Sequence, residues 1–127
     1  MTVSKDQKSF AAKSTILSVD AMGGDQGPAA VVAGLSLFAK KDRKTQFILH
    51  GPVATLTDLV AKRRNLEDRC TIIDATGVVT MDDKPSQVVR HGKDTSMWSA
   101  IESVRDGKAD VAVSCGNTGA LMALSMI

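Results

Sequence analysis

The stretch that decides the fold is TILSVDAMGGDQGPAAVVAGLSLFA, residues 15–39. Its first part, TILSVD, is short, mostly apolar or β-branched, and followed by glycines, which predicts a buried strand over residues 15–20. Pro28 suits the first turn of a helix, because the N–H group that proline lacks has no partner there. Apolar side chains then recur at helical spacing from Val31 to Ala39. The stretch therefore predicts a strand, a glycine-rich loop and a helix in direct succession.

The same alternation of strand and helix signals continues to the end of the chain. The further predicted strands cover residues 45–49, 70–73 and 109–114. The further predicted helices cover residues 53–60, 85–91, 95–107 and 118–127, with a polar, irregular segment at 74–84. Strands and helices that alternate through short connections predict a parallel sheet with helices on both faces. The predicted fold class is α/β, a three-layer α-β-α arrangement with a mainly parallel sheet.

The composition is that of a globular domain and excludes several classes of protein. Of the 127 residues, 43% are hydrophobic but only 3% are aromatic, so the core has to be built mainly from aliphatic side chains. The net charge is +2 and aromatic stacking platforms are scarce, so we expect no nucleic-acid partner. The basic clusters at residues 40–44 and 62–64 fall at expected helix C-termini, where the helix dipole favours them.

The cysteines and the two ends of the chain indicate its cellular location and the extent of its domain. Cys70 and Cys115 are too few for a disulfide scaffold, which predicts a reducing, cytoplasmic location. Cys115 is expected to be a small buried residue, because no histidine lies close to it in sequence. Residues 1–14 lack the apolar segment of a secretory signal and are predicted to form a mobile tail. Residues 15–127 are predicted to be the N-terminal part of an α/β catalytic domain, because the apolar run at 120–127 ends without a stop signal.

Three loops combine glycine, hydroxyl and small residues in the way that anion sites do at helix starts. They are DAMGGD at residues 20–25, KDTSM at 93–97 and SCGNTGA at 114–120. The loops after Asp20 and Ser114 both follow predicted strands, so we expect them to meet at the carboxyl edge of the sheet. Phosphate chemistry is therefore the leading hypothesis. No cluster of His, Cys, Asp or Glu has the spacing of metal ligands, so no metal site is predicted.

The first loop permits a close backbone approach but does not match a nucleotide fingerprint. Gly23 and Gly24 are adjacent, which breaks the dinucleotide pattern G-x-G-x-x-G, and the Walker pattern is absent. A tight strand-to-helix turn is the structural alternative. Asp20 and Asp25 would repel phosphate, so we expect them to orient a base, a loop amide or a substrate hydroxyl.

The second loop places the cations of Arg90 and Lys93 beside hydroxyl groups at a helix start, a mixture that suits phosphate. The structural alternative is helix capping by Asp94 or Thr95, which stabilises a helix by about 1 kcal/mol. Capping and ligand binding can coexist. His91 is expected to be a surface or packing residue rather than a base.

Four motifs together resemble the phosphate acyltransferase family of bacterial phospholipid synthesis. They are DAMGGDQGP (20–28), KPSQVVR (84–90), GKDTSM (92–97) and SCGNTGALMA (114–123). The resemblance runs from about Ile16 to the end of the chain, in order and with similar spacing. Members of that family are much longer and resemble phosphate acetyltransferases and isopropylmalate-type dehydrogenases in fold, so only their N-terminal portion is matched.

Three positions depart from what the resemblance leads us to expect. The chain has Cys115 in place of alanine, Thr95 in place of serine, and Trp98 where arginine is usual. Thr95 keeps the hydroxyl group and Cys115 stays small. Trp98 removes a cation that would favour phosphate or carrier binding.

The resemblance implies acyl transfer from acyl-[acyl carrier protein] to inorganic phosphate, which gives acyl phosphate. It implies acyl carrier protein and inorganic phosphate as partners, a homodimer, no cofactor and a cytoplasmic location. Association with the membrane periphery stays open, because no amphipathic anchor is visible but the product is a lipid intermediate.

The predicted catalytic residues are Lys93, which offsets the charge of phosphate, Asn117, which stabilises the oxyanion, and Asp20. The predicted phosphate- and substrate-binding residues are Gly23, Gly24, Asp25, Thr95, Ser96, Met97, Gly116, Thr118 and Gly119. The mechanism requires positioning of the two substrates, with neither a metal nor a covalent enzyme intermediate.

Two other functions remain open from the sequence. One is an isopropylmalate-type NAD-dependent dehydrogenase, which shares the sheet but needs nicotinamide and a divalent metal. The other is a non-catalytic module that binds a phosphorylated ligand. A further reading is that this segment is inactive by itself because partner segments are missing.

Overall fold

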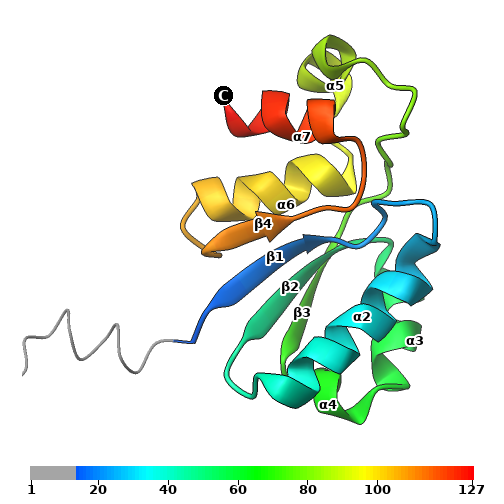
Figure 1. The fold of residues 1–127 in the computed structure, drawn as a ribbon. Helices are drawn as coiled ribbons and strands as arrows, with labels where there is room; N and C mark the ends of the chain where they lie inside the picture. Colours follow the sequence, from blue (N-terminus) through cyan, green and yellow to red (C-terminus); the bar gives the residue numbers. More distant parts are fainter. Residues whose placement is uncertain (1–13) are drawn as a thin grey trace, which may run out of the picture.

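The computed structural model of the protein describes residues 14–127. The predicted tail therefore lies outside the described residues, apart from its last position. Four parallel strands form one sheet in the order β3-β2-β1-β4 (Figure 1). The strands are β1 (Ile16–Asp20), β2 (Gln46–Gly51), β3 (Cys70–Asp74) and β4 (Val111–Val113). The predicted α/β class with a parallel sheet is confirmed.

Helices cover both faces of the sheet and complete three layers (Figure 1). On one face lie α2 (Gly27–Lys41), α3 (Val53–Ala61) and the single turn α4 (Arg64–Glu67). On the other face lies α6 (Ser96–Arg105), with α7 (Thr118–Ser125) against it and α5 (Pro85–His91) against α7. The predicted order of elements is correct except for α4, which was not predicted, and β4, which is shorter than residues 109–114.

The core is mainly aliphatic, as the composition predicts, and it is divided by the sheet. One buried cluster lies between the sheet and the helices α2, α3 and α4, and it includes Phe47, Leu49, Leu56 and Leu66. The other cluster joins α5, α6 and α7. One face of α7 packs through Ala120 and Leu124, whereas its outer residues Met122 and Met126 are 68% and 82% exposed, because no described segment covers them.

The C-terminal end of α2 is fixed by one arginine. The Arg69 guanidinium donates hydrogen bonds to the backbone oxygens of Ala39, Asp42 and Thr45, and it lies 5.5 Å from the centre of the Phe47 ring. Carbonyl groups at a helix C-terminus carry partial negative charge, so a cation there stabilises them. With this end anchored, the N-terminal end of α2 is held at the carboxyl edge of the sheet, beside the loop that follows β1 (Figure 1).

Candidate functional site

Asp20 is the centre of a cluster in which three elements meet at the carboxyl edge of the sheet. Its side chain is only 3% exposed. The Ser96 hydroxyl at the start of α6 donates to Oδ1 at 2.5 Å, and the Ser114 hydroxyl after β4 donates to Oδ2 at 2.8 Å. The Met22 N–H donates to Oδ1 at 3.1 Å, so Asp20 orients a loop amide, as one reading of the sequence expected. The loops after Asp20 and Ser114 meet, as predicted.

Gly23 is required by close approach within this cluster. A Cβ atom at position 23 would lie 2.7 Å from Ser114 Oγ, 2.9 Å from Asp20 Oδ2 and 3.0 Å from the Gly116 nitrogen. No side chain fits at these distances unless the cluster moves. The neighbouring Gly24 has φ +97°, a conformation that L side chains rarely adopt. The two adjacent glycines that break the dinucleotide pattern therefore serve the contact between the β1 and β4 loops.

The substitution Gly23→Ala tests this contact. We expect it to lower the free energy of unfolding by about 2–3 kcal/mol, because the new methyl group overlaps three polar atoms that cannot move independently. Chemical denaturation followed by Trp98 fluorescence measures the loss. Gly34→Ala is the matched control, because nothing lies within 4 Å of a Cβ there and the position is inside α2. The control should gain about 0.5–1 kcal/mol, and equal effects of the two substitutions would contradict the close-approach argument.

The N-terminus of α7 leaves backbone donors free beside the Asp20 cluster. The Asn117 side chain caps the helix, since its Oδ1 accepts from the Ala120 N–H at 3.1 Å. The N–H groups of Asn117, Thr118 and Gly119 donate to no acceptor within the described part of the chain. Free donors and the positive end of the helix dipole favour an anion at this position.

Asn117 is nevertheless already engaged through its amide nitrogen. Nδ2 donates to the backbone oxygens of Thr80 at 3.1 Å and Asp83 at 2.8 Å, which uses both of its hydrogens. The side chain thus ties the irregular segment at 74–84 to the start of α7. For Asn117 to donate to an oxyanion, as the sequence led us to expect, one of these two bonds has to open.

The loop before α6 is more fully satisfied. Thr95 caps the helix by accepting from the Trp98 N–H at 3.2 Å, and its hydroxyl donates to the Gly92 oxygen at 2.6 Å. The Thr95 and Ser96 N–H groups donate to the oxygens of Gly92 and Gly77. Met97 is 1% exposed and belongs to the core. The structural alternative, capping by Thr95, is therefore what the loop shows.

Among the remaining predicted site residues, Lys93, Asp25, Thr118 and Gly119 are exposed, whereas Gly116 is buried. Lys93 makes no hydrogen bond or ion pair with any described residue, so its ammonium group is available to a ligand. Asp25 lies on the loop after β1, and Thr118 and Gly119 lie in the first turn of α7. The structure thus brings together Asp20, Gly23, Ser96 and Gly116, whereas Lys93 makes no hydrogen bond or ion pair with these residues.

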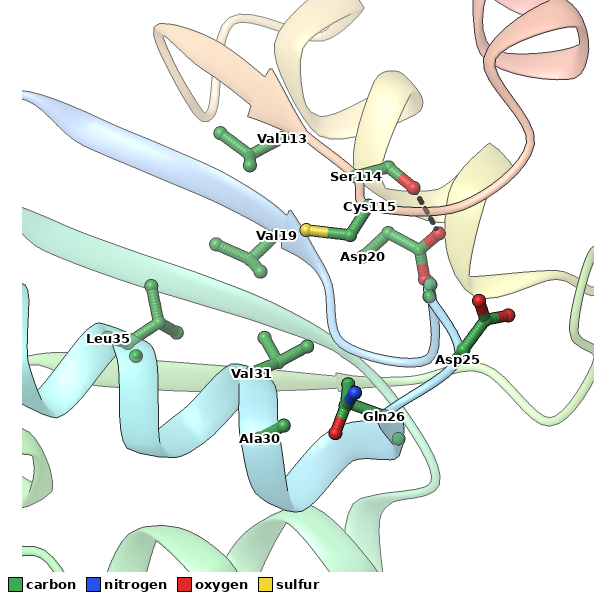
Figure 2. A pocket seen from close by; sticks show the side chains of 14 residues that line it. Val19, Asp20, Asp25, Gln26, Ala30, Val31, Leu35, Val113, Ser114 and Cys115 are labelled. Carbon is green, nitrogen blue, oxygen red and sulfur yellow. Dashed lines mark hydrogen bonds between the residues drawn. The ribbon is translucent and has the colours of Figure 1, made fainter.

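A groove of about 430 Å³ opens beside the cluster, between α2 and the strands β1 and β4 (Figure 2). Its walls are largely apolar and include Ala30, Val31, Leu35, Val19 and Val113. Its polar end includes Asp20, Ser114 and the Gly23–Gly27 loop. Figure 2 shows the Cys115 thiol pointing from the β4 loop toward Val19. Cys115 is exposed, so the expectation that it is buried is wrong: it follows a short edge strand rather than a covered one.

A second polar group, which was not predicted as part of a site, lies beneath the Asp20 cluster. His50 at the end of β2 is fully buried, with Nε2 2.8 Å from Ser18 Oγ and Nδ1 2.6 Å from Ser99 Oγ. The Ser18 hydroxyl donates its only hydrogen to the Ala100 oxygen, so it has to accept from Nε2–H, and Nδ1 accepts from Ser99. Burial lowers the pKa of His50 to about 4, which keeps the imidazole neutral near neutral pH.

Within residues 14–127, no group of three or more His, Cys, Asp or Glu side chains is arranged to hold a metal ion. Among the helices described, none has the length and apolar character needed to cross a membrane.

Comparison with known proteins assigns the chain to a family. Residues 15–127 match the profile of the family described as fatty acid synthesis protein. The chain belongs to this family. A phosphate acyltransferase of Roseobacter denitrificans is 71% identical over 112 residues, which are 88% of the chain and 31% of that relative. A phosphate acyltransferase of Ruegeria pomeroyi is 63% identical over 127 residues, the whole chain and 34% of the relative.

A third relative of the same name, from Paracoccus denitrificans, is 65% identical over 112 residues, which are 88% of the chain and 30% of that protein. The chain thus spans about one third of the length of the curated relatives that it matches. All side chains of the Asp20 cluster lie within residues 15–127, the segment of this chain that matches the family.

Proposed function

We propose that this chain carries the phosphate site of an enzyme that transfers an acyl group from acyl-[acyl carrier protein] to inorganic phosphate. The observation that carries the proposal is the start of α7, where three consecutive N–H groups have no acceptor among residues 14–127 and lie beside an exposed hydroxyl at Thr118. The relatives named phosphate acyltransferase support the same reaction. Asp20 carries negative charge, and the hydroxyl of Thr95 is already hydrogen-bonded, so both are less suited to bind an anion.

The chemical step is the displacement of a thiolate by phosphate. An oxygen of hydrogen phosphate forms a bond to the thioester carbonyl carbon, the carbon–sulfur bond breaks, and the phosphate proton ends on the thiol. The products are an acyl phosphate and the free thiol of the carrier. A thiol with a pKa of about 8.5 leaves without a strong general acid. The protein therefore contributes mainly by holding phosphate next to the thioester and stabilising the oxyanion.

The residues divide into those that touch phosphate and those that position them. The amides of 117–119 and the Thr118 hydroxyl bind phosphate oxygens, and Lys93 offsets their negative charge. Asp20 acts as a positioning residue, because its carboxylate is already occupied by Ser96 and Ser114. Asn117 holds the helix start. When substrate binds, one of its two Nδ2–H groups leaves its backbone acceptor and donates a hydrogen bond to the oxyanion.

Phosphate titration of the chain, followed by amide-resolved NMR, tests the site. We expect the largest shifts at the amides of residues 117–119, with smaller ones near Lys93. NAD, added in parallel, should leave the Gly23–Gly27 loop unshifted. Lys93→Met should weaken phosphate binding by up to about fivefold, the effect of one exposed charge pair. Lys108→Met is the matched control. Lys108 is exposed and precedes β4, at the amino ends of the strands and away from the site, so this substitution should leave the affinity unchanged.

Acyl transfer is tested in a chimera. Residues 15–127 replace the matching segment of the Roseobacter denitrificans relative, and acyl phosphate is measured after addition of acyl-[acyl carrier protein] and phosphate. We expect turnover comparable to that of the unmodified relative. An inactive but folded chimera, assayed beside an active parent, would contradict the proposal and favour a module that only binds a phosphorylated ligand.

A further inference from the structure

The contact between α6 and the sheet contains a row of three serine hydroxyls. Ser96, Ser99 and Ser103 are spaced three and four residues apart, so they lie on one face of the helix. Ser96 Oγ bonds Asp20 of β1, and Ser99 Oγ bonds Nδ1 of His50 in β2. Ser103 Oγ lies 3.5 Å from Nε2 of the same imidazole. Hydrogen bonds depend on direction, so this row fixes the position of α6 more narrowly than apolar contact does.

The imidazole of His50 is the point where this row and the sheet are joined. His50 Nδ1 lies 2.6 Å from Ser99 Oγ. Its Nε2 lies 2.8 Å from Ser18 Oγ, which in turn donates to the Ala100 oxygen at 2.7 Å. The side chains of Ser18, His50 and Ser103 are all buried, and no buried side-chain nitrogen or oxygen in the described residues lacks a partner. A buried polar group that loses its partner is costly, so the joined network strongly favours one arrangement.

Asp20 and His50 are opposite each other in the pairing of β1 with β2. Ser96 and Ser99, which bond them, lie within one turn of α6. A shift of α6 at Ser99 therefore moves Ser96 relative to Asp20. Asp20 in turn holds Ser114, and Ser114 Oγ accepts from the Gly116 N–H at 3.1 Å in the loop before α7.

We propose that His50 is a positioning residue for the candidate site: by holding Ser99 and Ala100 it keeps the Ser96 hydroxyl on Asp20 and so fixes the β4–α7 loop. The effect of His50 on the position of the β4–α7 loop does not depend on a ligand. The consequence for phosphate affinity rests on the proposed function, because it assumes that the N–H groups of residues 117–119 bind the anion.

The test removes the His50 contact from the α6 side, which leaves the imidazole in place. In Ser99→Ala we expect the Gly116 amide to exchange its hydrogen about 5- to 10-fold faster, the effect of about one lost hydrogen bond. Ser99→Thr keeps the hydroxyl and should restore slow exchange. Leu66→Ala is the control for general destabilisation, because Leu66 is fully buried in the cluster on the other face of the sheet. It should leave Gly116 exchange unchanged.

The same variants are then titrated with inorganic phosphate. We expect the dissociation constant to rise about fivefold in Ser99→Ala and to return toward the original value in Ser99→Thr, with no change in folded Leu66→Ala. If the unsubstituted chain does not bind phosphate, the proposed function fails, while Gly116 exchange still decides the role of His50. Unchanged exchange in Ser99→Ala, or acceleration in Ser99→Thr and Leu66→Ala alike, overturns the positioning role.

Discussion

Replacing Asp20 with asparagine is expected to lower the free energy of unfolding by about 3 kcal/mol. The carboxylate accepts hydrogen bonds from Ser96, Ser114 and the Met22 N–H, and it is almost fully buried. In asparagine one oxygen becomes an NH₂ group, which faces a hydroxyl donor instead of accepting from it. The bonds that remain are weaker, because a neutral acceptor binds less strongly than a charged one. Chemical denaturation followed by Trp98 fluorescence gives the difference.

The control for this substitution lies five residues further along the same loop. Asp25 is exposed, so Asp25→Asn is expected to change the free energy of unfolding by less than about 0.5 kcal/mol. The Gly116 amide resonance should move in Asp20→Asn and stay in place in Asp25→Asn. A loss below about 1 kcal/mol in Asp20→Asn would show that the three hydrogen bonds contribute little net stability.

Acidification from pH 6.5 to pH 4 is expected to remove about 3 kcal/mol of stability through His50 alone. Burial lowers the pKa of His50 from 6.5 to about 4, although the negative charge of Asp20 acts in the opposite direction. Between these values the unfolded chain binds a proton at His50 and the folded chain does not. The free energy of unfolding therefore falls as the pH falls through this window. Above pH 6.5 neither state binds a proton at His50, so the full stability is retained.

Denaturation curves at a series of pH values, for the original chain and His50→Gln, isolate this contribution. The variant should lose less stability between pH 6.5 and 4, whereas His91→Gln, at an exposed position, should retain the full loss. The pKa of Asp42 is lowered by hydrogen bonds from the Lys44 and Thr45 N–H groups. Its loss of stability at low pH is common to all three chains and cancels in the difference. Identical profiles for the original chain and His50→Gln would contradict the assignment.

The sequence was sufficient for the order of the elements because apolar periodicity and glycine breaks mark each of them. The same reasoning missed α4, since its four residues are too few to show a helical period. The predicted last strand was too long, because Ala109, Asp110 and Ser114 lie outside the pairing of β4 with β1, which covers only Val111–Val113. The meeting of the Asp20 and Ser114 loops was predictable, since both follow parallel strands.

The side chains that complete the site were less accessible to sequence reasoning. Ser114 lies in one of the four motifs, but the sequence does not predict it as a site residue, because its hydroxyl acquires its role only beside Asp20. His50 and Ser18 carried a signal, a polar residue within each of two apolar strands. Their partner Ser99 depends on how α6 lies across the sheet, which no local pattern specifies. The capping roles of Thr95 and Asn117, in contrast, follow from their places at helix starts.

The hydrogen bond between Ser114 and Asp20 joins residues 94 positions apart in the chain. β1 pairs with β2, which follows it after a single crossover through α2, and β2 is next to β3. During synthesis this half of the sheet is available for pairing long before β4 leaves the ribosome. Bringing Ser114 to Asp20 closes a longer loop and costs more chain entropy, and the compensating contacts form only when β4 docks on β1. We therefore expect the polar cluster at Asp20 to form late in folding, after β1, β2 and β3 have paired.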